Sequence, residues 1–282
     1  MSFIEHLSSE LKRVQNFYLN QSVDNEEKKI MLDAINAMKN EEFKLYVQPQ
    51  FSLKNNKICA GEVLVRWIKD SGEIIMPDDF IFIFEANQFI DLFDLYMLDK
   101  TCRKIEEWLK EEKTILPIAI NQSRLHINKK HYIDDFCEIV DHYHIPHEYI
   151  VFELTESGFI ENREEIITFT DKLHEKEFSL AIDDFGTGYA YISILSFVSA
   201  EILKLDKTLL NDFQANHKTQ IILSKVIEMA HQMKMIVLCE GVENEQQLHF
   251  LKQIECDLVQ GFLMGRPEPI DAFAKEWFKG RT

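Results

Sequence analysis

From residue 42 onward the chain repeats one pattern, in which a short apolar run is in most cases followed by a stretch of helical periodicity. Strands that alternate with helices at this spacing form parallel βαβ units. A closed (β/α)8 barrel takes about 250 residues, so eight such runs in about 240 residues predict a barrel rather than an open sheet. The eight runs are 43–50, 58–67, 115–123, 149–157, 179–186, 201–207, 235–242 and 257–264.

The first two runs are joined differently from the others. Only the polar turn Lys54-Asn55-Asn56-Lys57 and its flanks lie between them, which leaves no room for a helix. A turn of this length joins antiparallel neighbours, whereas parallel strands need a longer crossover. The predicted fold class is therefore α/β, a TIM-like (β/α)8 barrel with one antiparallel strand near the start. Helices are expected between the later strands, at 163–176, 218–233 and 243–254.

The segment ahead of the first strand has a different organisation. Residues 3–19 carry Leu7, Leu11, Val14 and Tyr18 at helical spacing, which predicts an amphipathic helix. A polar break follows, and then a second helical pattern that includes Ile30 and residues up to 38. We expect residues 1–22 to be an appendage to a barrel domain that spans 23–282. The helix at 3–19 is a candidate docking element for a separate sensor protein.

Bulk properties exclude several classes of protein. The net charge of −17 argues against DNA or RNA as a partner, because a phosphate backbone is bound by basic faces. No apolar run reaches 18 residues, so no membrane span is expected, and the first residues lack the apolar core of a signal peptide. Five scattered cysteines without a C-x-x-C pair indicate reduced thiols. Together these features predict a cytoplasmic protein.

Polar side chains mark the ends of the predicted strands. In a barrel the carboxyl ends of the strands meet at one mouth, where active sites are built. Five carboxylates in one mouth raise one another's pKa unless cations lie between them. Oxygen ligands without grouped cysteine or histidine select Mg²⁺ or Mn²⁺. The side chains in question are Gln48, Glu62, Asn121, Glu153, Asp183, Asp184, Lys204, Glu240 and Gln260.

Two adjacent aspartates suggest the chemistry. Asp183 and Asp184 at one strand end allow a single loop to serve two ions, and two ions about 3.5–4 Å apart are the usual device for phosphodiester cleavage. Lys204 would orient the attacking water or stabilise developing charge. Each feature also has an ordinary structural interpretation: a turn at Asp183-Asp184, a helix cap at any acidic strand end, or a surface lysine. The coincidence of all of them at consecutive strand ends favours the site.

These residues fall into motifs that resemble the EAL-domain phosphodiesterases. The resemblance extends from about residue 28 to residue 272, and its specificity comes from the ordered set of motifs rather than from any one of them. The motifs are Gly61-Glu62-Val63-Leu64-Val65-Arg66-Trp67, Glu153-Leu154-Thr155-Glu156-Ser157, Asp183-Asp184-Phe185-Gly186-Thr187-Gly188-Tyr189, Leu203-Lys204-Leu205-Asp206, Glu240-Gly241-Val242-Glu243 and Gln260-Gly261-Phe262-Leu263.

The resemblance implies a TIM-like barrel that hydrolyses cyclic di-GMP to linear pGpG over two Mg²⁺ or Mn²⁺ ions. It implies one metal held by Glu62, Asn121, Glu153 and Asp183, and a second served by Asp183 and Asp184. The resemblance also places Glu240 in the same metal site and Gln260 beside it, and it implies that both side chains hold metal-bound waters. Lys204 helps activate the nucleophilic water, together with the catalytic carboxylates Glu62, Asp183 and Glu240. The implied substrate contacts are Gln48, Leu64, Arg66 and Gln260, and Glu156 is the implied anchor of the loop after Asp183-Asp184.

Three positions depart from the family pattern. Val63 stands where the signature has alanine, which adds two methyl groups but removes no functional group. The loop reads Gly188-Tyr189-Ala190-Tyr191 where serines usually follow the tyrosine. In the family that loop is linked to dimerisation and metal coupling, so the difference bears on regulation and on whether activity is reduced. Gln50 replaces an aliphatic residue.

Three functions remain open at this point. The leading hypothesis is hydrolysis by a two-metal, single-displacement attack of water. An alternative is a cyclic di-GMP receptor that binds without cleaving, as in family members whose metal ligands are eroded. The third is a protein-interaction module that uses the barrel as a scaffold and the helix at 3–19 as its contact. A homodimer through residues 189–213 is expected by analogy with the family.

Overall fold

The computed structural model describes residues 3–20, 26–159, 162–187, 192–211 and 216–279. Its strands are β1 (Phe43–Ser52), β2 (Lys57–Ile68), β3 (Ile74–Ile75), β4 (Ile118–Asn121), β5 (Ile150–Thr155), β6 (Ser179–Phe185), β7 (Ile202–Leu205), β8 (Ile236–Cys239), β9 (Leu258–Val259) and β10 (Glu268–Pro269). Its α-helices are α1 (Phe3–Leu19), α2 (Glu26–Lys39), α3 (Ile81–Ala86), α4 (Ile90–Lys110), α5 (Tyr132–His142), α6 (Arg163–Glu175), α7 (His217–Gln232), α8 (Glu245–Gln253) and α9 (Ile270–Lys279).

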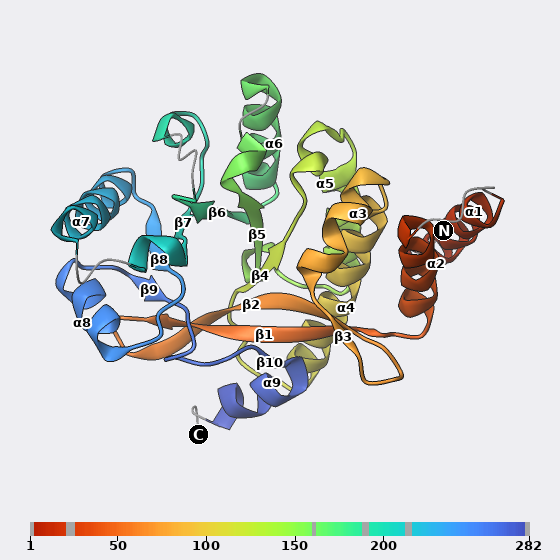
Figure 1. Ribbon diagram of the computed structural model, residues 1–282, viewed down its shortest axis with the longest axis horizontal. Helices are drawn as coiled ribbons and strands as arrows, with labels where there is room; N and C mark the ends of the chain where they lie inside the picture. Colours follow the sequence, from red (N-terminus) through yellow and green to blue (C-terminus); the bar gives the residue numbers. More distant parts are fainter. Residues whose placement is uncertain (1–2, 21–25, 160–161, 188–191, 212–215, 280–282) are drawn as a thin grey trace.

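Eight of the strands close into a barrel (Figure 1). The parallel order runs β2-β4-β5-β6-β7-β8-β9, and β1 closes the ring because it pairs with both β2 and β9. Both of these pairings are antiparallel, so β1 is the antiparallel strand that the short first turn predicts. The predicted fold class is confirmed, and each of the eight apolar runs overlaps one barrel strand. The short strands β3 and β10 pair outside the ring, with β2 and β1 respectively.

The barrel interior is layered beneath the mouth. Ala119, Val151 and Ala181 form a separate buried cluster with Ile202 packed against it. Because side chains on a strand alternate between its two faces, the residue two positions further along each strand faces the same way. Those residues are Asn121, Glu153, Asp183 and Lys204. A layer of small apolar side chains therefore supports a polar layer at the carboxyl ends of the strands.

The two long strands differ from the expected pattern at the mouth. The sequence places Gln48 and Glu62 at strand ends, but the structure places both within strands that continue to Ser52 and Ile68. The reason is that β1 and β2 pair with each other along their whole length, while β2 contacts β4 only at residues 61–63. Glu62 reaches the mouth because it lies where β2 touches the barrel ring.

An aromatic core fills the space between this hairpin and the first helices of the barrel. The Phe43 ring lies 4.8 Å from Phe93 and 5.0 Å from Trp67, centroid to centroid, in tilted and edge-on geometries that aromatic pairs favour. Phe80 and Phe84 complete the cluster, and all five rings are buried. This packing fixes α3 and α4 against the hairpin.

The helix α1 lies beside α2 at one edge of the molecule (Figure 1). Leu11 and Tyr18 on α1 are buried, and the Tyr18 hydroxyl donates a hydrogen bond to Asn87 Oδ1 at 2.8 Å. Phe17 and Leu19 are exposed. The expected helix at 3–19 is thus present, whereas the domain boundary at residue 22 and a sensor partner stay predictions. Within the described ranges, no helix has the length and apolar character needed to cross a bilayer.

Candidate active site at the mouth of the barrel

Lys204 lies at the centre of the polar layer. Its side chain is fully buried, so the interpretation of this residue as a surface lysine is wrong. A buried ammonium is stable only when opposite charges surround it. Four carboxylates do so: burial acts to lower the pKa of Lys204, but their negative charges outweigh it and raise the pKa well above its ordinary value. The distances from Lys204 Nζ are 2.9 Å to Glu240 Oε1, 3.1 Å to Glu153 Oε1, 3.1 Å to Asp183 Oδ1 and 3.4 Å to Glu62 Oε2.

Glu62 is held in its ionised form by hydrogen-bond donors on both oxygens. Asn121 Nδ2 donates to Oε1 at 2.8 Å, and Gln260 Nε2 donates to Oε2 at 2.6 Å. Burial acts to raise the pKa of Glu62, but Lys204 and these donors outweigh it and lower the pKa overall. Gln260 Nε2 also donates to Gln48 Oε1 at 3.2 Å, so the antiparallel strand is tied to the same cluster.

Glu153 is buried with fewer donors. Burial and the neighbouring carboxylates raise its pKa well above the ordinary value despite the charge of Lys204. Its Oε2 atom is buried without a hydrogen-bond partner in the described part of the chain. A buried carboxylate oxygen in this condition is costly. The chemistry of the site therefore favours a cation next to Glu153.

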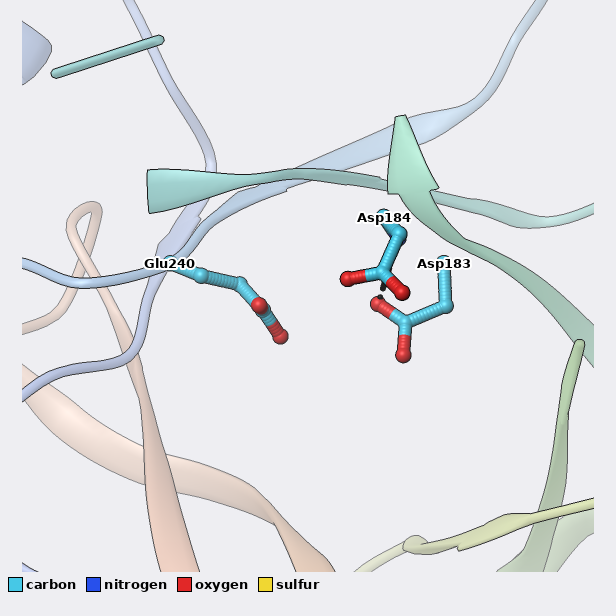
Figure 2. Close-up of side chains that lie close together, drawn as sticks. All are labelled: Asp183, Asp184 and Glu240. Atoms are coloured by element: carbon cyan, nitrogen blue, oxygen red, sulfur yellow. Dashed lines mark hydrogen bonds between the residues drawn. The ribbon is translucent and has the colours of Figure 1, made fainter. Parts of the chain in front are cut away.

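A local irregularity brings two consecutive aspartates to one side of β6. On a regular strand Asp183 and Asp184 would point to opposite faces. The register of β6 against β7 shifts between Ile182 and Phe185, and Asp184 has a left-handed backbone with φ 56°. Such a bulge re-aims a side chain. As a result Asp183, Asp184 and Glu240 offer ligand oxygens that all lie within 4.8 Å of one another (Figure 2).

Two of these carboxylates are electrostatically strained. Burial, and then the charge of Asp183, raise the pKa of Asp184 to about 6. Burial is also the largest cause that raises the pKa of Glu240 to about 7, although Lys204 acts in the opposite direction. Grouped carboxylates that resist ionisation are the arrangement expected of a site built for cations.

Glu156 contacts the loop that follows the two aspartates. Its Oε2 atom accepts a hydrogen bond from the Gly186 backbone N–H at 3.3 Å. Gly186 has φ 105°, a conformation that other residues adopt only with strain. Glu156 therefore contacts this loop, and its role as the anchor of the loop stays a prediction. The unusual residues of this loop, Tyr189 to Tyr191, lie outside the described residues, and the expected homodimer through residues 189–213 stays a prediction.

A cleft of about 490 Å³ opens beside Glu240. Predicted substrate contacts line it: Gln48, Leu64, Arg66 and Gln260. The structure adds Lys207, Phe262 and Arg266, with the Arg266 guanidinium 4.0 Å from the centroid of the half-exposed Phe262 ring. The cleft therefore combines three cations with an aromatic face next to the acidic group.

Sequence reasoning missed some residues of this site. Asp206 is buried, and its charge contributes to the raised pKa of Asp184, after burial and Asp183. It stands two residues after Lys204 in one of the motifs given above. Because side chains alternate along a strand, continuing the alternation from Lys204 would have placed Asp206 on the same face. Lys207 begins a short 3-10 helix and Arg266 lies in a loop, and the pattern of the sequence carries no signal for either.

Val63, the departure in the signature, lies away from the mouth. It is buried and follows the inward-facing Glu62, so strand alternation directs it toward the helix layer. Its two additional methyl groups are accommodated there without touching the carboxylate cluster.

Gly261 allows the end of β9 to approach β8 closely. A Cβ atom at this position would lie 2.2 Å from both the backbone N and O of Val242. We expect Gly261→Ala to lower the free energy of unfolding by about 2–3 kcal/mol, because backbone atoms cannot yield as side chains do. Thermal unfolding measures the loss of stability, with Gly72→Ala as a control. A Cβ atom at Gly72 would meet only open space, so this variant shows the effect of strain at a positive φ without a close contact. A smaller loss at Gly261 than at Gly72 would contradict the close approach.

Comparisons with known proteins agree with this geometry. The EAL domain family matches residues 32–267. Cyclic di-GMP phosphodiesterase NbdA of Pseudomonas aeruginosa is 31% identical over 236 residues, which cover 84% of this chain and 30% of that protein. Signaling protein YkoW of Bacillus subtilis is 32% identical over 237 residues, with coverages of 84% and 30%. The chain thus spans about a third of the length of these relatives.

Solved structures show the same architecture. The phosphodiesterase described as "PaMucR Phosphodiesterase, c-di-GMP complex" superposes with a TM-score of 0.81 at 26% identity, covering 87% of this chain and 99% of that one. The FimX EAL domain of Pseudomonas aeruginosa bound to c-di-GMP gives 0.77 at 19% identity, with coverages of 86% and 97%, and supports the fold alone. Together with the family match over residues 32–267, these findings show that the chain belongs to the EAL domain family.

Proposed function

We propose that this protein hydrolyses cyclic di-GMP to linear 5′-pGpG in a metal-dependent reaction and so lowers the concentration of that second messenger. The observation that carries the proposal is the meeting of Asp183, Asp184 and Glu240 beside a buried Lys204. The names of NbdA and of the PaMucR complex support the same substrate for this family.

The donor set fits two divalent cations of the Mg²⁺ or Mn²⁺ type. We assign Glu62, Asn121, Glu153 and Asp183 to one ion, and Asp183 and Asp184 to a second, with Glu240 in the same site. Asn121 supports this assignment because its Nδ2 atom donates to Glu62, which leaves Oδ1 as the acceptor atom. When bound, such ions supply positive charge beside the phosphate and activate water.

Lys204 and its neighbours direct the attack. The Lys204 ammonium is buried and fixed by four carboxylates, so it offers a charge-assisted donor at a fixed place to the attacking water or to the phosphate oxygens. Water oxygen attacks one phosphorus in line, and the bond from that phosphorus to the 3′ oxygen breaks. The product keeps one 5′-phosphate and gains one 3′-hydroxyl, which is linear pGpG.

The cationic cleft suits the rest of the substrate. Arg66, Lys207 and Arg266 line it and would offset the negative charge of the second phosphate. Phe262 offers an exposed ring face on which a base can stack, with a strength of about 1–3 kcal/mol. Gln48, Leu64 and Gln260 complete the wall nearest the metal site.

The variant Arg66→Ala tests the cleft. We expect KM for cyclic di-GMP to rise about tenfold, equivalent to about 1.4 kcal/mol, while kcat changes little, since the guanidinium contacts bound substrate rather than the reacting bond. Steady-state kinetics measure both constants. Arg13→Ala on α1 is the control, because the Arg13 side chain is largely exposed and pairs with Glu10 at the surface. A loss confined to kcat would contradict the assignment of Arg66 to substrate binding.

A cyclic di-GMP receptor without activity is the alternative in the same site. Incubating the purified protein with cyclic di-GMP and Mn²⁺, and separating products by chromatography, distinguishes the two. We expect pGpG to accumulate and to be suppressed by EDTA. Tight binding of the nucleotide with no product over hours would place the protein among receptors. The intact set of acidic residues favours hydrolysis.

A further inference from the structure

The backbone corner that follows β4, residues 122–126, is held by buried polar groups from three helices. The Ser123 N–H donates to Asp94 Oδ2 of α4 at 3.0 Å, and the Ser123 hydroxyl donates to Glu85 Oε1 of α3 at 2.6 Å. The Tyr132 hydroxyl of α5 donates to Gln122 Oε1 at 2.6 Å. Gln122, Ser123, Asp94 and Tyr132 are all less than a tenth exposed.

A histidine fixes the groups that hold the corner. His126 is fully buried, with Nε2 2.7 Å from Asp94 Oδ2, and its ring stacks on Tyr132 at 3.6 Å between centroids and 6° between planes. Asp91 Oδ1 lies 3.3 Å from His126 Nδ1, a charge contact in which neither atom has a hydrogen-bond partner among the described residues. Buried polar networks are costly unless satisfied, and when satisfied they rigidify the structure around them. This network is concentrated at one strand end rather than spread through the core.

The corner directly follows Asn121, the last residue of β4 and the residue assigned to the first metal ion. Gln122 Nε2 donates to the Asn121 backbone carbonyl at 2.8 Å, and the Gln122 N–H donates to the Glu153 carbonyl at 2.9 Å. The Asn121 side chain in turn donates to Glu62. A ligand must be held within about 0.5 Å of its productive place, and surrounding hydrogen bonds achieve this. The backbone on the carboxyl side of Asn121 is held in this way.

We propose that Tyr132 is a positioning residue for the metal site. It acts through Gln122 to fix the backbone of Asn121, and Glu85 and Asp94 perform the same task through Ser123. This inference rests on the proposed function, in which Asn121 Oδ1 contacts a divalent ion. Loss of one outer partner typically weakens metal binding or activity by about 10–100-fold, and we expect the lower end here because Tyr132 acts through a second side chain.

Comparing two tyrosine variants distinguishes an effect on metal positioning from an effect on the stability of the fold. Tyr132 begins α5 and Tyr143 follows its end; both are buried, and the Tyr143 hydroxyl donates to Asp99 Oδ1 at 2.8 Å. We expect Tyr132→Phe and Tyr143→Phe to lower the melting temperature similarly, since each loses one buried hydrogen bond. We expect the Mn²⁺ affinity to fall about tenfold in Tyr132→Phe and to stay unchanged in Tyr143→Phe. The electron paramagnetic resonance signal of free Mn²⁺ measures this affinity on the full chain.

Glu85 provides a test by conservative replacement. Glu85→Gln keeps an oxygen that accepts from the Ser123 hydroxyl, whereas Glu85→Ala removes it. We expect Mn²⁺ affinity to stay near that of the unmodified protein in Glu85→Gln and to fall in Glu85→Ala. Equal losses in both variants would overturn the hydrogen bond as the cause.

The outcomes distinguish the two proposals. If the unmodified protein binds no Mn²⁺, the proposed function fails and the positioning role fails with it. If the unmodified protein binds Mn²⁺ and hydrolyses cyclic di-GMP, but Tyr132→Phe binds the ion as well as Tyr143→Phe does, then the function stands and the positioning role is overturned. A selective loss of Mn²⁺ affinity in Tyr132→Phe supports the positioning role, and formation of pGpG by the unmodified protein supports the proposed function.

Discussion

Replacing Asp183 by asparagine is expected to reduce the turnover of cyclic di-GMP by about 10³-fold. Asp183, like Glu240, contacts Lys204 and also belongs to the group with Asp184; its Oδ1 atom lies 3.1 Å from Lys204 Nζ. Asparagine preserves the shape of the side chain but removes its negative charge. Chromatographic measurement of kcat tests the effect, and circular dichroism verifies that the fold is retained.

Asp99→Asn is the matched control for this variant. Asp99 is an aspartate on α4 that is as buried as Asp183 but pairs with Arg103 and Tyr143, outside the mouth. Its replacement tests what the loss of a buried carboxylate does to the fold alone. Full activity in Asp183→Asn, or equal losses of activity in the two variants, would overturn the assignment of the acidic site.

Lys204→Met is expected to destabilise the metal-free protein by about 3–5 kcal/mol, since removing one partner of a buried ion cluster leaves uncompensated charge. The four carboxylates around Nζ then face one another without the ammonium. For a domain of this size the loss corresponds to roughly 10 °C in melting temperature. We expect activity to fall as well, because the variant lacks the donor that we propose for the attacking water or the phosphate.

Mn²⁺ is expected to restore part of this stability, because a ligand that binds only the folded state stabilises that state by mass action. At a free ligand concentration of 100 times its Kd, the free energy of unfolding rises by about 2.7 kcal/mol. Thermal unfolding in EDTA and in excess Mn²⁺ measures both effects. Lys225→Met is the control, since Lys225 is exposed on α7 and pairs with Glu228 at the surface. A Lys204→Met variant that melts like the unmodified protein in EDTA would contradict the buried ion cluster.

The barrel could be predicted from sequence because its strands are buried on both faces. Such strands form continuous apolar runs, and in β4 and β5 the apolar run leads to a polar side chain at the mouth, Asn121 and Glu153 respectively. Parallel strands in a barrel share one mouth, so the tips converge without any long-range information. The grouping of Glu62, Glu153, Asp183 and Glu240 around Lys204 follows from this rule.

Other features depend on contacts that no local pattern records. The long pairing of β1 with β2 places Gln48 and Glu62 inside strands rather than at their ends. The left-handed backbone of Asp184 is a consequence of the β6 bulge, and sequence gives no measure of it. The buried network of Asp94, His126 and Tyr132 joins elements far apart in the chain, and these residues have no period or motif in common.

Hydrolysis in water enriched with ¹⁸O tests the central claim most directly. The account predicts that a single turnover with Mn²⁺ yields pGpG carrying one ¹⁸O atom, located on its 5′-phosphate, because one water attacks phosphorus in a single displacement. Mass spectrometry of the product and of its phosphate locates the label, and EDTA abolishes the reaction. Unlabelled pGpG, or cyclic di-GMP recovered intact from a protein that binds it, would contradict the claim.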